Sequence, residues 1–163
     1  MSEILIRPYN DKDADSVWAV LEPTIRAGET YPLEQRMSKA ESLAYWLSHD
    51  AVFVAEDGPM LVGTYYLTAN HKGGGAHVAN CGYMVAPWAQ GRGIARTMCA
   101  HSLSEAKSRQ FRAIQFNFVV SSNERAVKLW ESFGFEIVGR LPGAFRHPKS
   151  GFVDAFVMYL QLT

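Results

Sequence analysis

The spacing of apolar residues along the chain predicts seven strands and four helices. Period-two alternation and short apolar runs rich in β-branched and aromatic residues favour strands, whereas apolar positions three and four apart favour helices. Strands are expected over residues 4–9, 51–56, 61–69, 77–85, 113–120, 135–139 and 152–162. Helices are expected from Asp11 or Asp13 to Pro23, and over residues 38–47, 93–109 and 123–133. The order β-α-α-β-β-β-α-β-α-β-β, without internal repeats, predicts one mixed α/β domain over residues 1–163.

Several local signals mark where these elements begin and end. Ser38 and Glu41 have the spacing of a capping box, and Gly134 is typical of a helix C-terminus. Residues 24–37 lack periodicity and predict a loop. Three glycines at 73–75 suit a flexible hairpin connection, and residues 141–151, with two prolines and two glycines, predict a loop between the last two strands.

Composition excludes several classes of protein. Sixteen basic and sixteen acidic residues give a formal net charge of zero, which argues against nucleic acid as a partner. The two cysteines, Cys81 and Cys99, form no metal-ligand motif, so no metal site or disulfide scaffold is expected. Met1–Asn10 lacks the pattern of a signal peptide, and no apolar stretch is long enough to cross a membrane. A cytoplasmic location is expected.

The most informative segment is Gln90-Gly91-Arg92-Gly93-Ile94-Ala95. A strand runs into this turn, and the turn opens a long helix whose first N–H groups suit a phosphate or pyrophosphate. Glycines allow anion oxygens to approach these amides. The segment lacks the Lys-Ser/Thr of a P-loop, and Arg96 replaces the third small residue of a dinucleotide fingerprint. It matches the pattern Gln/Arg-x-x-Gly-x-Gly/Ala, although a helix start with structural glycines is the plainer alternative.

The segment, together with the preceding Val85-x-Pro87, resembles the coenzyme A motif of the GCN5-related N-acetyltransferase (GNAT) superfamily. Asn123–Phe135, from Asn-Glu-Arg-Ala to Phe-Gly-Phe, resembles the second signature of that superfamily. The resemblance implies a mixed central β-sheet flanked by helices, in which the parallel strands 77–85 and 113–120 splay apart. It also implies that acetyl-CoA is the co-substrate.

The same resemblance assigns roles around the cofactor. The backbone of Met84 and Val85 would bind the pantetheine arm, with the Val85 N–H as the donor to the oxyanion. Asn123 would contact the pantetheine arm, cap its helix, or do both. The pyrophosphate would be held by Gln90, Gly91, Arg92, Gly93, Ile94 and Ala95.

The expected reaction is direct attack of a neutral amine on the acetyl carbonyl, which needs a proton acceptor and a route for the thiolate to leave. Trp130 stands where many relatives carry a tyrosine acid, and we expect it to pack in the core. Tyr83 and Tyr31 are candidate substitutes for that acid. Asn80 stands where some relatives carry the base, and His77 is an alternative base or a plain surface residue.

The acceptor is indicated by weaker features. Asn80 and Asn117 lie on the two strands expected to splay, where each side chain needs either an internal backbone hydrogen-bond partner or a small polar substrate. Phe116–Val120, Asn80–Tyr83 and Val138–Pro142 are similar to the fungal proline-analogue (azetidine-2-carboxylate) N-acetyltransferases, which implies a small amino or imino acid.

Two loops, 28–36 and 141–151, would form the acceptor pocket. In the first, Glu29 and Tyr31 could bind an ammonium group. In the second, Arg146 or Lys149 could bind a carboxylate. Each of these four side chains could equally be a solvated surface group.

Two other functions remain open. A protein or peptide N-acetyltransferase would need an open acidic groove, whereas a non-catalytic coenzyme A-binding module would be consistent with the missing tyrosine at 130. The apolar strand 152–162 offers a surface for a homodimer.

Overall fold

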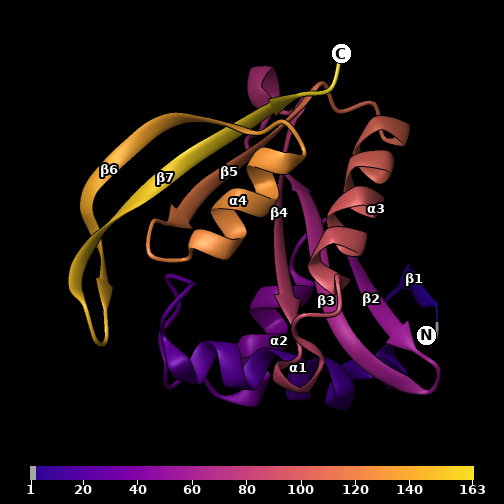
Figure 1. Cartoon of the computed structure of the whole chain (residues 1–163). Coiled ribbons are helices and arrows are strands. Elements are labelled where there is room, and N and C mark those ends of the chain that lie inside the picture. Colours follow the sequence, from indigo (N-terminus) through magenta and orange to yellow (C-terminus); the bar gives the residue numbers. More distant parts are fainter. Residues whose placement is uncertain (1–2) are drawn as a thin grey trace.

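The seven strands form one mixed sheet in the order β1-β2-β3-β4-β5-β7-β6. The computed structural model describes residues 3–163 (Figure 1). Residues 1 and 2 of the segment Met1–Asn10 lie outside the described residues. The strands are β1 (Ile4–Pro8), β2 (Ala51–Asp57), β3 (Met60–Ala69), β4 (Val78–Val85), β5 (Ala113–Val120), β6 (Glu136–His147) and β7 (Gly151–Gln161). The helices are α1 (Ala14–Ala27), α2 (Lys39–Leu47), α3 (Ile94–Ser108) and α4 (Glu124–Ser132).

The parallel pair in the middle of the sheet is very short. β4 and β5 pair only at Val78 with Ala113 and at Ala79 with Ile114, after which the two strands diverge (Figure 1). Every other neighbouring pair in the sheet is antiparallel. The expected splay of the parallel strands is therefore confirmed, and it opens the sheet from Asn80 onward.

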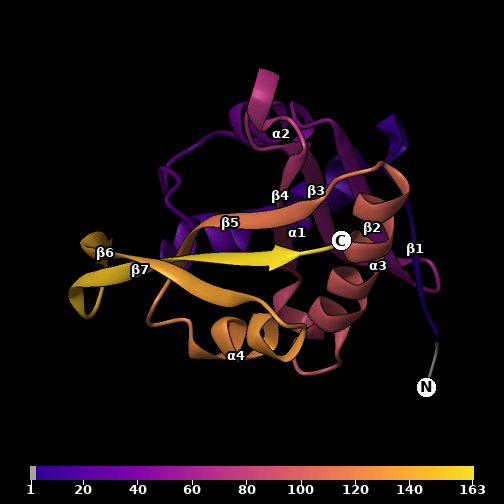
Figure 2. The ribbon, with the colours of Figure 1, turned by 90° about the horizontal axis from the view of Figure 1, so that it is seen from above.

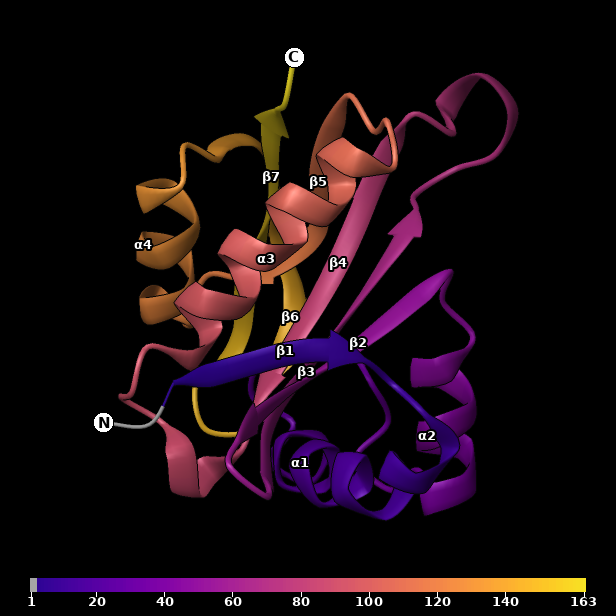
Figure 3. The ribbon, with the colours of Figure 1, turned by 90° about the vertical axis from the view of Figure 1, so that its right-hand side faces the viewer.

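Helices cover both faces of the sheet, with α1 and α2 on one side and α3 and α4 on the other (Figure 2). Adjacent residues of β3 mark the two faces, because side chains alternate along a strand. Tyr65 reaches His101 of α3, whereas Tyr66 packs on Trp46 of α2. Figure 3 looks onto α3, which packs along β3 and β4. Within the described residues, no helix is long and apolar enough to cross a membrane.

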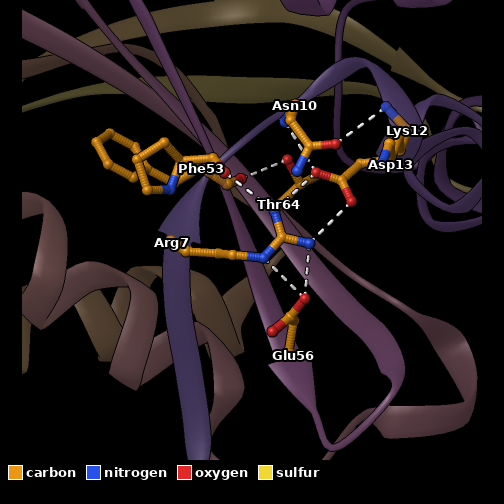
Figure 4. Close-up of polar contacts among 8 residues, drawn as sticks. Arg7, Asn10, Lys12, Asp13, Phe53, Glu56 and Thr64 are labelled. Atoms are coloured by element: carbon orange, nitrogen blue, oxygen red, sulfur yellow. Dashed lines mark hydrogen bonds and ion pairs between the residues drawn. The ribbon is translucent and has the colours of Figure 1, made fainter.

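The first strand is joined to the start of α1 by a charged cluster (Figure 4). The Arg7 guanidinium donates to both carboxylate oxygens of Asp13, at 2.8 Å each, and its Nε donates to Glu56 on β2. Hydrogen bonds from Arg7 hold the pKa of the Asp13 carboxyl below its usual range, against the opposing effect of burial. Arg7 thus fixes β1, β2 and the entry to α1 relative to one another.

The first helix differs from its prediction at both ends. Asn10 caps the short 3₁₀ turn Asp11–Asp13, and the Asp13 side chain makes no capping bond to α1. Pro23 does not end the helix, which continues to Ala27 and stops at Gly28 in the left-handed conformation. Because the buried positions Val20, Leu21 and Ile25 continue across Pro23, packing offsets the hydrogen bond that proline removes. The capping box of Ser38 and Glu41 is confirmed.

The last two strands also differ from their prediction. β6 runs on to His147 and pairs with β7 as far as Gly151, so most of the expected loop 141–151 is a long hairpin. Register shifts next to Val138 and between Leu141 and Phe145 accommodate the proline and the glycine. β5 has an irregularity of the same kind: its register with β7 shifts between Phe116 and Val119, and the Phe118 ring contacts Phe145 of β6.

Candidate functional site

A cavity of about 910 Å³ lies where β4 and β5 part. We divide its lining into two regions. The turn end consists of Gln90, Gly91, Gly93, Ile94, Ala95, Arg96, Asn123, Arg125, Ala126 and Lys128, and the tyrosine end of Thr24, Thr30, Tyr31, Pro32, Tyr45, Tyr66 and Asn80. Between them lie Tyr83, Met84, Val85, Phe116 and Trp130, among others.

The turn end presents an open helix N-terminus. Gly91 and Gly93 have φ values of 78° and 77°, which glycine adopts without strain. Gly93 is the N-cap residue of α3 and no side chain caps the helix there. A Cβ built on either glycine would meet no other atom of the chain within 4 Å, so the space beside these amides is free for a ligand. The arrangement suits a pyrophosphate bound by backbone N–H groups.

Basic side chains reinforce this end, but Arg92 is not one of them. Arg96, Arg125 and Lys128 line the cavity. Arg92 instead forms an ion pair with Asp57 at the end of β2. Of the predicted segment, Arg92 is therefore the one residue that does not line the cavity.

The exposed edge of β4 is occupied at one position by a tyrosine. The Tyr31 hydroxyl donates to the Tyr83 carbonyl oxygen and accepts from the Tyr83 N–H, both at 2.7 Å. Ala86 N–H, by contrast, bonds to Val62 of β3. Since backbone groups alternate in direction along a strand, Val85 shares the direction of Tyr83 toward the gap, whereas Met84 faces β3. The expected backbone contact from Met84 is thus directed away from the cavity, which Met84 nevertheless lines.

Tyr83 and Trp130 form an aromatic wall on the α3–α4 side. Their ring centroids are 4.9 Å apart, and Phe116 contacts both. The Tyr83 hydroxyl lies 2.6 Å from the Ser102 hydroxyl, which donates to Cys99 O. Burial raises the pKa of the Tyr83 phenol well above its ordinary value. Trp130 is buried, as expected, and also lines the cavity.

Asn80 and Asn117 lie on the face of α1 and α2. Asn80 lines the cavity and, two positions from Gly82, shares the face that Tyr66 covers. Asn117 lines the cavity too, but its amide exchanges hydrogen bonds with Asn70 and accepts one from Gln115. Asn117 therefore has internal partners, from side chains and not from the backbone.

The remaining predicted residues divide between the site and the surface. Asn123 caps α4, accepting from the Ala126 N–H at 3.4 Å, and also lines the turn end. Glu29 is 3.2 Å from Lys149 in an ion pair that joins the α1–α2 loop to the β6–β7 turn, and neither belongs to the cavity lining described above. Arg146 lies over the Phe152 ring and His77 is exposed. Glu29, Arg146 and Lys149 thus lack the pocket positions expected of them.

Tyr45 and Tyr66 are cavity residues that sequence reasoning missed. Both lie inside apolar patterns that predict burial without indicating which cavity they face. The lining also has a property that no single motif reveals: among the residues that line the cavity, none is aspartate, glutamate or histidine. Within residues 3–163 no cluster of three metal-ligating side chains occurs.

Comparison with known proteins gives consistent matches. The sequence profile of the acetyltransferase (GNAT) family matches residues 18–135. N-acetyltransferase aca1 of Schizosaccharomyces pombe is 27% identical, over 82% of this chain and 72% of that protein. A GCN5-related N-acetyltransferase from Kribbella flavida is 36% identical and superposes with a TM-score of 0.93 over 97% of each chain.

The same fold occurs in a more distant solved structure. A GNAT superfamily phosphinothricin acetyltransferase from Sinorhizobium meliloti, in complex with acetyl-CoA, is 18% identical and has a TM-score of 0.84. The match covers 97% of this chain and 88% of that one.

Proposed function

The chain belongs to the acetyltransferase (GNAT) family, and from this premise we propose that it acetylates the amine of a small molecule. It is an N-acetyltransferase with acetyl-CoA as co-substrate. That the acceptor is a small molecule is our proposal. We also propose that residues 1–163 form a single catalytic domain. The observation that carries the proposal of a small-molecule acceptor is the tyrosine end of the cavity, which is bordered by the α1–α2 loop and has no charged side chain in its lining.

We assign the turn end to the pyrophosphate of acetyl-CoA. The N–H groups at the start of α3, with Gly91 and Gly93 leaving space beside them, suit this anion, and Arg96, Arg125 and Lys128 add positive charge. The Val85 N–H, on the free edge of β4, is the proposed donor to the oxyanion. When bound, acetyl-CoA supplies the thioester whose acetyl carbonyl is attacked.

We assign the tyrosine end to the acceptor. A peptide acceptor needs an open groove, and recognition of its cationic residues favours carboxylates, yet no acidic side chain contributes to the lining as described. Asn80 supplies an amide for hydrogen bonding to a polar substrate. We therefore propose a small amino or imino acid, in keeping with the resemblance to proline-analogue acetyltransferases.

The proton of the attacking amine cannot pass directly to a carboxylate base, because no carboxylate lines the cavity as described. Burial raises the pKa values of Tyr31, Tyr66 and Tyr83, so these phenols stay neutral at physiological pH and none is a base there. Asn80 does not titrate. We infer that the amine binds as its free base or loses its proton to water. Tyr83, held against Ser102 beside Trp130, stays a candidate donor toward the leaving sulfur.

Two measurements test this function. Acetyl-CoA at about 100 times its dissociation constant should stabilise the fold by ~2.7 kcal/mol. Thiol release should follow addition of small amino or imino acids, but not of peptides. Turnover of peptides alone would favour the protein acetyltransferase alternative, and stabilisation without turnover of any acceptor would favour a non-catalytic coenzyme A-binding module.

We also propose that two copies associate through the β6–β7 hairpin. Phe152 and Val138 are 74% and 58% exposed, and Ile137 and Leu141 are also exposed along the same hairpin. Exposed apolar side chains on an edge hairpin favour association.

We further propose a cytoplasmic location. Cys81 and Cys99 are both free thiols in the fold, which supports a reducing compartment.

A further inference from the structure

Tyr66 crosses from its own strand onto the next one. It pairs with Gly82 across β3 and β4. A Cβ built on Gly82 would lie 2.7 Å from the Tyr66 Cζ and 2.9 Å from its hydroxyl oxygen, far closer than two such atoms approach. The phenol end of the ring therefore lies over the backbone of β4, whose other edge borders the cavity. Only glycine at position 82 leaves room for this path.

The ring is held on its other side by α2 and the turn that follows it. The His49 imidazole stacks on Tyr66 with centroids 3.5 Å apart and planes 8° from parallel, and Trp46 packs edge-on at 4.9 Å. His49 Nδ1 donates to the Trp46 carbonyl. One face of the ring lies on His49 and its phenol end lies over Gly82, so the ring is confined between the turn after α2 and β4. Tyr66 thus presents a fixed edge and its hydroxyl to the cavity.

Trp46 is itself anchored to the sheet. Its indole N–H donates to the Thr64 hydroxyl at 3.1 Å, and Thr64 donates to the Phe53 carbonyl at 2.7 Å. Figure 4 shows Thr64 beside Phe53 at this junction. Residues on β2, β3 and α2 therefore combine to fix one phenol. Such rigidity is what a pocket wall needs if it is to discriminate between ligands by size.

From this geometry we propose that Tyr66 is the specificity-determining residue of the acceptor pocket. Its confined ring limits the depth available to the acceptor, and its hydroxyl contacts the acceptor at the end of the cavity that Tyr31 and Tyr45 also line. Larger amines are excluded because the ring occupies the space that they would need. The inference rests on the proposed function, since it concerns the acceptor of the acetyl group.

The test compares acceptor size in two matched variants. Tyr66→Leu shortens the side chain and deepens the pocket, whereas Tyr65→Leu removes an equally buried phenol from the opposite face of the same strand. The probes are glycine, alanine, 2-aminobutyrate, norvaline and norleucine. We expect the ratio of kcat/KM for norleucine over alanine to rise about tenfold or more in Tyr66→Leu. Tyr65→Leu should leave the ratio at the wild-type value, and KM for acetyl-CoA should not change in either.

Binding gives a reading that does not depend on catalysis. Titration calorimetry of the coenzyme A-loaded protein with the same amino acids should show the same change of ranking. If the wild-type protein binds these amino acids without acetylating any, the proposed function fails while the size limit can still be read from binding. An unchanged ranking in Tyr66→Leu, or no binding of any member of the series by either protein, overturns the inference.

A second variant covers the case in which Tyr66→Leu does not fold. Gly82→Ala keeps the phenol but forces the ring from its path, so the acceptor ranking should change here as well. Where Tyr66→Leu does fold, the added methyl group has room in that background, and Gly82→Ala should then have no further effect. Equal effects of Gly82→Ala in both backgrounds would contradict the proposed path of the ring.

Discussion

Tyr31 replaces a missing strand partner. Where β5 has moved away, the Tyr31 hydroxyl satisfies both backbone groups of Tyr83 and thereby fastens the α1–α2 loop over the cavity. Burial raises the pKa of this phenol, so the hydroxyl keeps its proton and can both donate and accept. The hydroxyl of Tyr31, a residue expected to bind an ammonium group, is therefore used to hold the α1–α2 loop against β4.

Tyr31→Phe should remove both bonds and leave two buried backbone groups without that partner. We expect a loss of about 2 kcal/mol of unfolding free energy and roughly a tenfold rise in KM for the acceptor. KM for acetyl-CoA should stay the same. Urea unfolding and steady-state kinetics measure these quantities, and Tyr159→Phe, on β7 outside the cavity lining, is the control. Unchanged stability in Tyr31→Phe would show that these bonds do not hold the loop.

Arg7 pairs with Asp13, the one buried carboxylate among the described residues. Arg7→Met should lower the unfolding free energy at neutral pH by about 2 kcal/mol, because the buried Asp13 loses its charged donor. The folded-state pKa of Asp13 lies below its unfolded value, so this stability is present above about pH 4 and is lost as the pH falls through the folded value. The difference between the two proteins should therefore shrink in acid.

Arg140→Met provides the matched comparison for this prediction. Arg140 also pairs with an aspartate, Asp154, but on the exposed hairpin. Solvent weakens such pairs, so the loss should be much smaller. Equal losses in the two variants would contradict the special role of Arg7.

At the scale of elements, the sequence was most informative where short-range chemistry decides the structure. The capping box at Ser38 and the glycine after α4 marked their boundaries, and β5 was predicted with its observed limits. Pro23 misled, because the local cost of proline was outweighed by core packing on both sides of it. Pro142 and Gly143 of β6 misled in the same way, because pairing with β7 tolerates bulges that a local pattern cannot reveal.

The two ends of the cavity differ in the same way in how far the sequence predicts them. The turn end comes from two short segments, residues 90–96 and 123–128, each of which carries a motif of its own, so most of its lining was expected from the sequence. The tyrosine end is assembled from α1, α2, β3, β4 and the loop after α1, so no segment carries its pattern. Nothing in the sequence around Tyr66 indicates that its ring crosses to β4, since this depends on Gly82, sixteen positions away in a different strand.

The start of α3 can be tested through Gly93. Gly93→Asp places a side chain and a negative charge beside the free amides, so the ~2.7 kcal/mol stabilisation by acetyl-CoA should disappear. Gly73→Asp is the control: it too has a positive φ, 57°, and open space, but it lies before β4 at the other end of that strand. Thermal unfolding with and without acetyl-CoA measures both. Retained stabilisation in Gly93→Asp would refute the pyrophosphate assignment.

At the scale of the molecule, the cavity passes between the two faces of the sheet and is neutral at the end assigned to the acceptor. Without an acidic or imidazole base in the described lining, the pH dependence of kcat/KM should follow the amine itself. We expect kcat/KM to rise about tenfold per pH unit up to the pKa of the acceptor amine. Acceptors of lower amine pKa should reach their plateau at lower pH. A common midpoint for amines of different pKa would instead reveal a titrating group on the protein.

Association through the β6–β7 hairpin is the remaining property of the whole molecule, and it follows from the end of the sheet being left open. β6 is the outermost strand, and Val138 lies at a register shift beside the exposed Ile137. Light scattering should give twice the chain mass for the wild-type protein and the chain mass for Phe152→Asp combined with Val138→Asp. Met60→Asp, an equally exposed apolar position on β3, should leave the dimer intact. The double variant should be monomeric because carboxylates buried without partners cost more free energy than burial of such an apolar surface gains. A dimer that survives both charges would show that the contact lies elsewhere, and a monomeric wild-type protein would show that there is none.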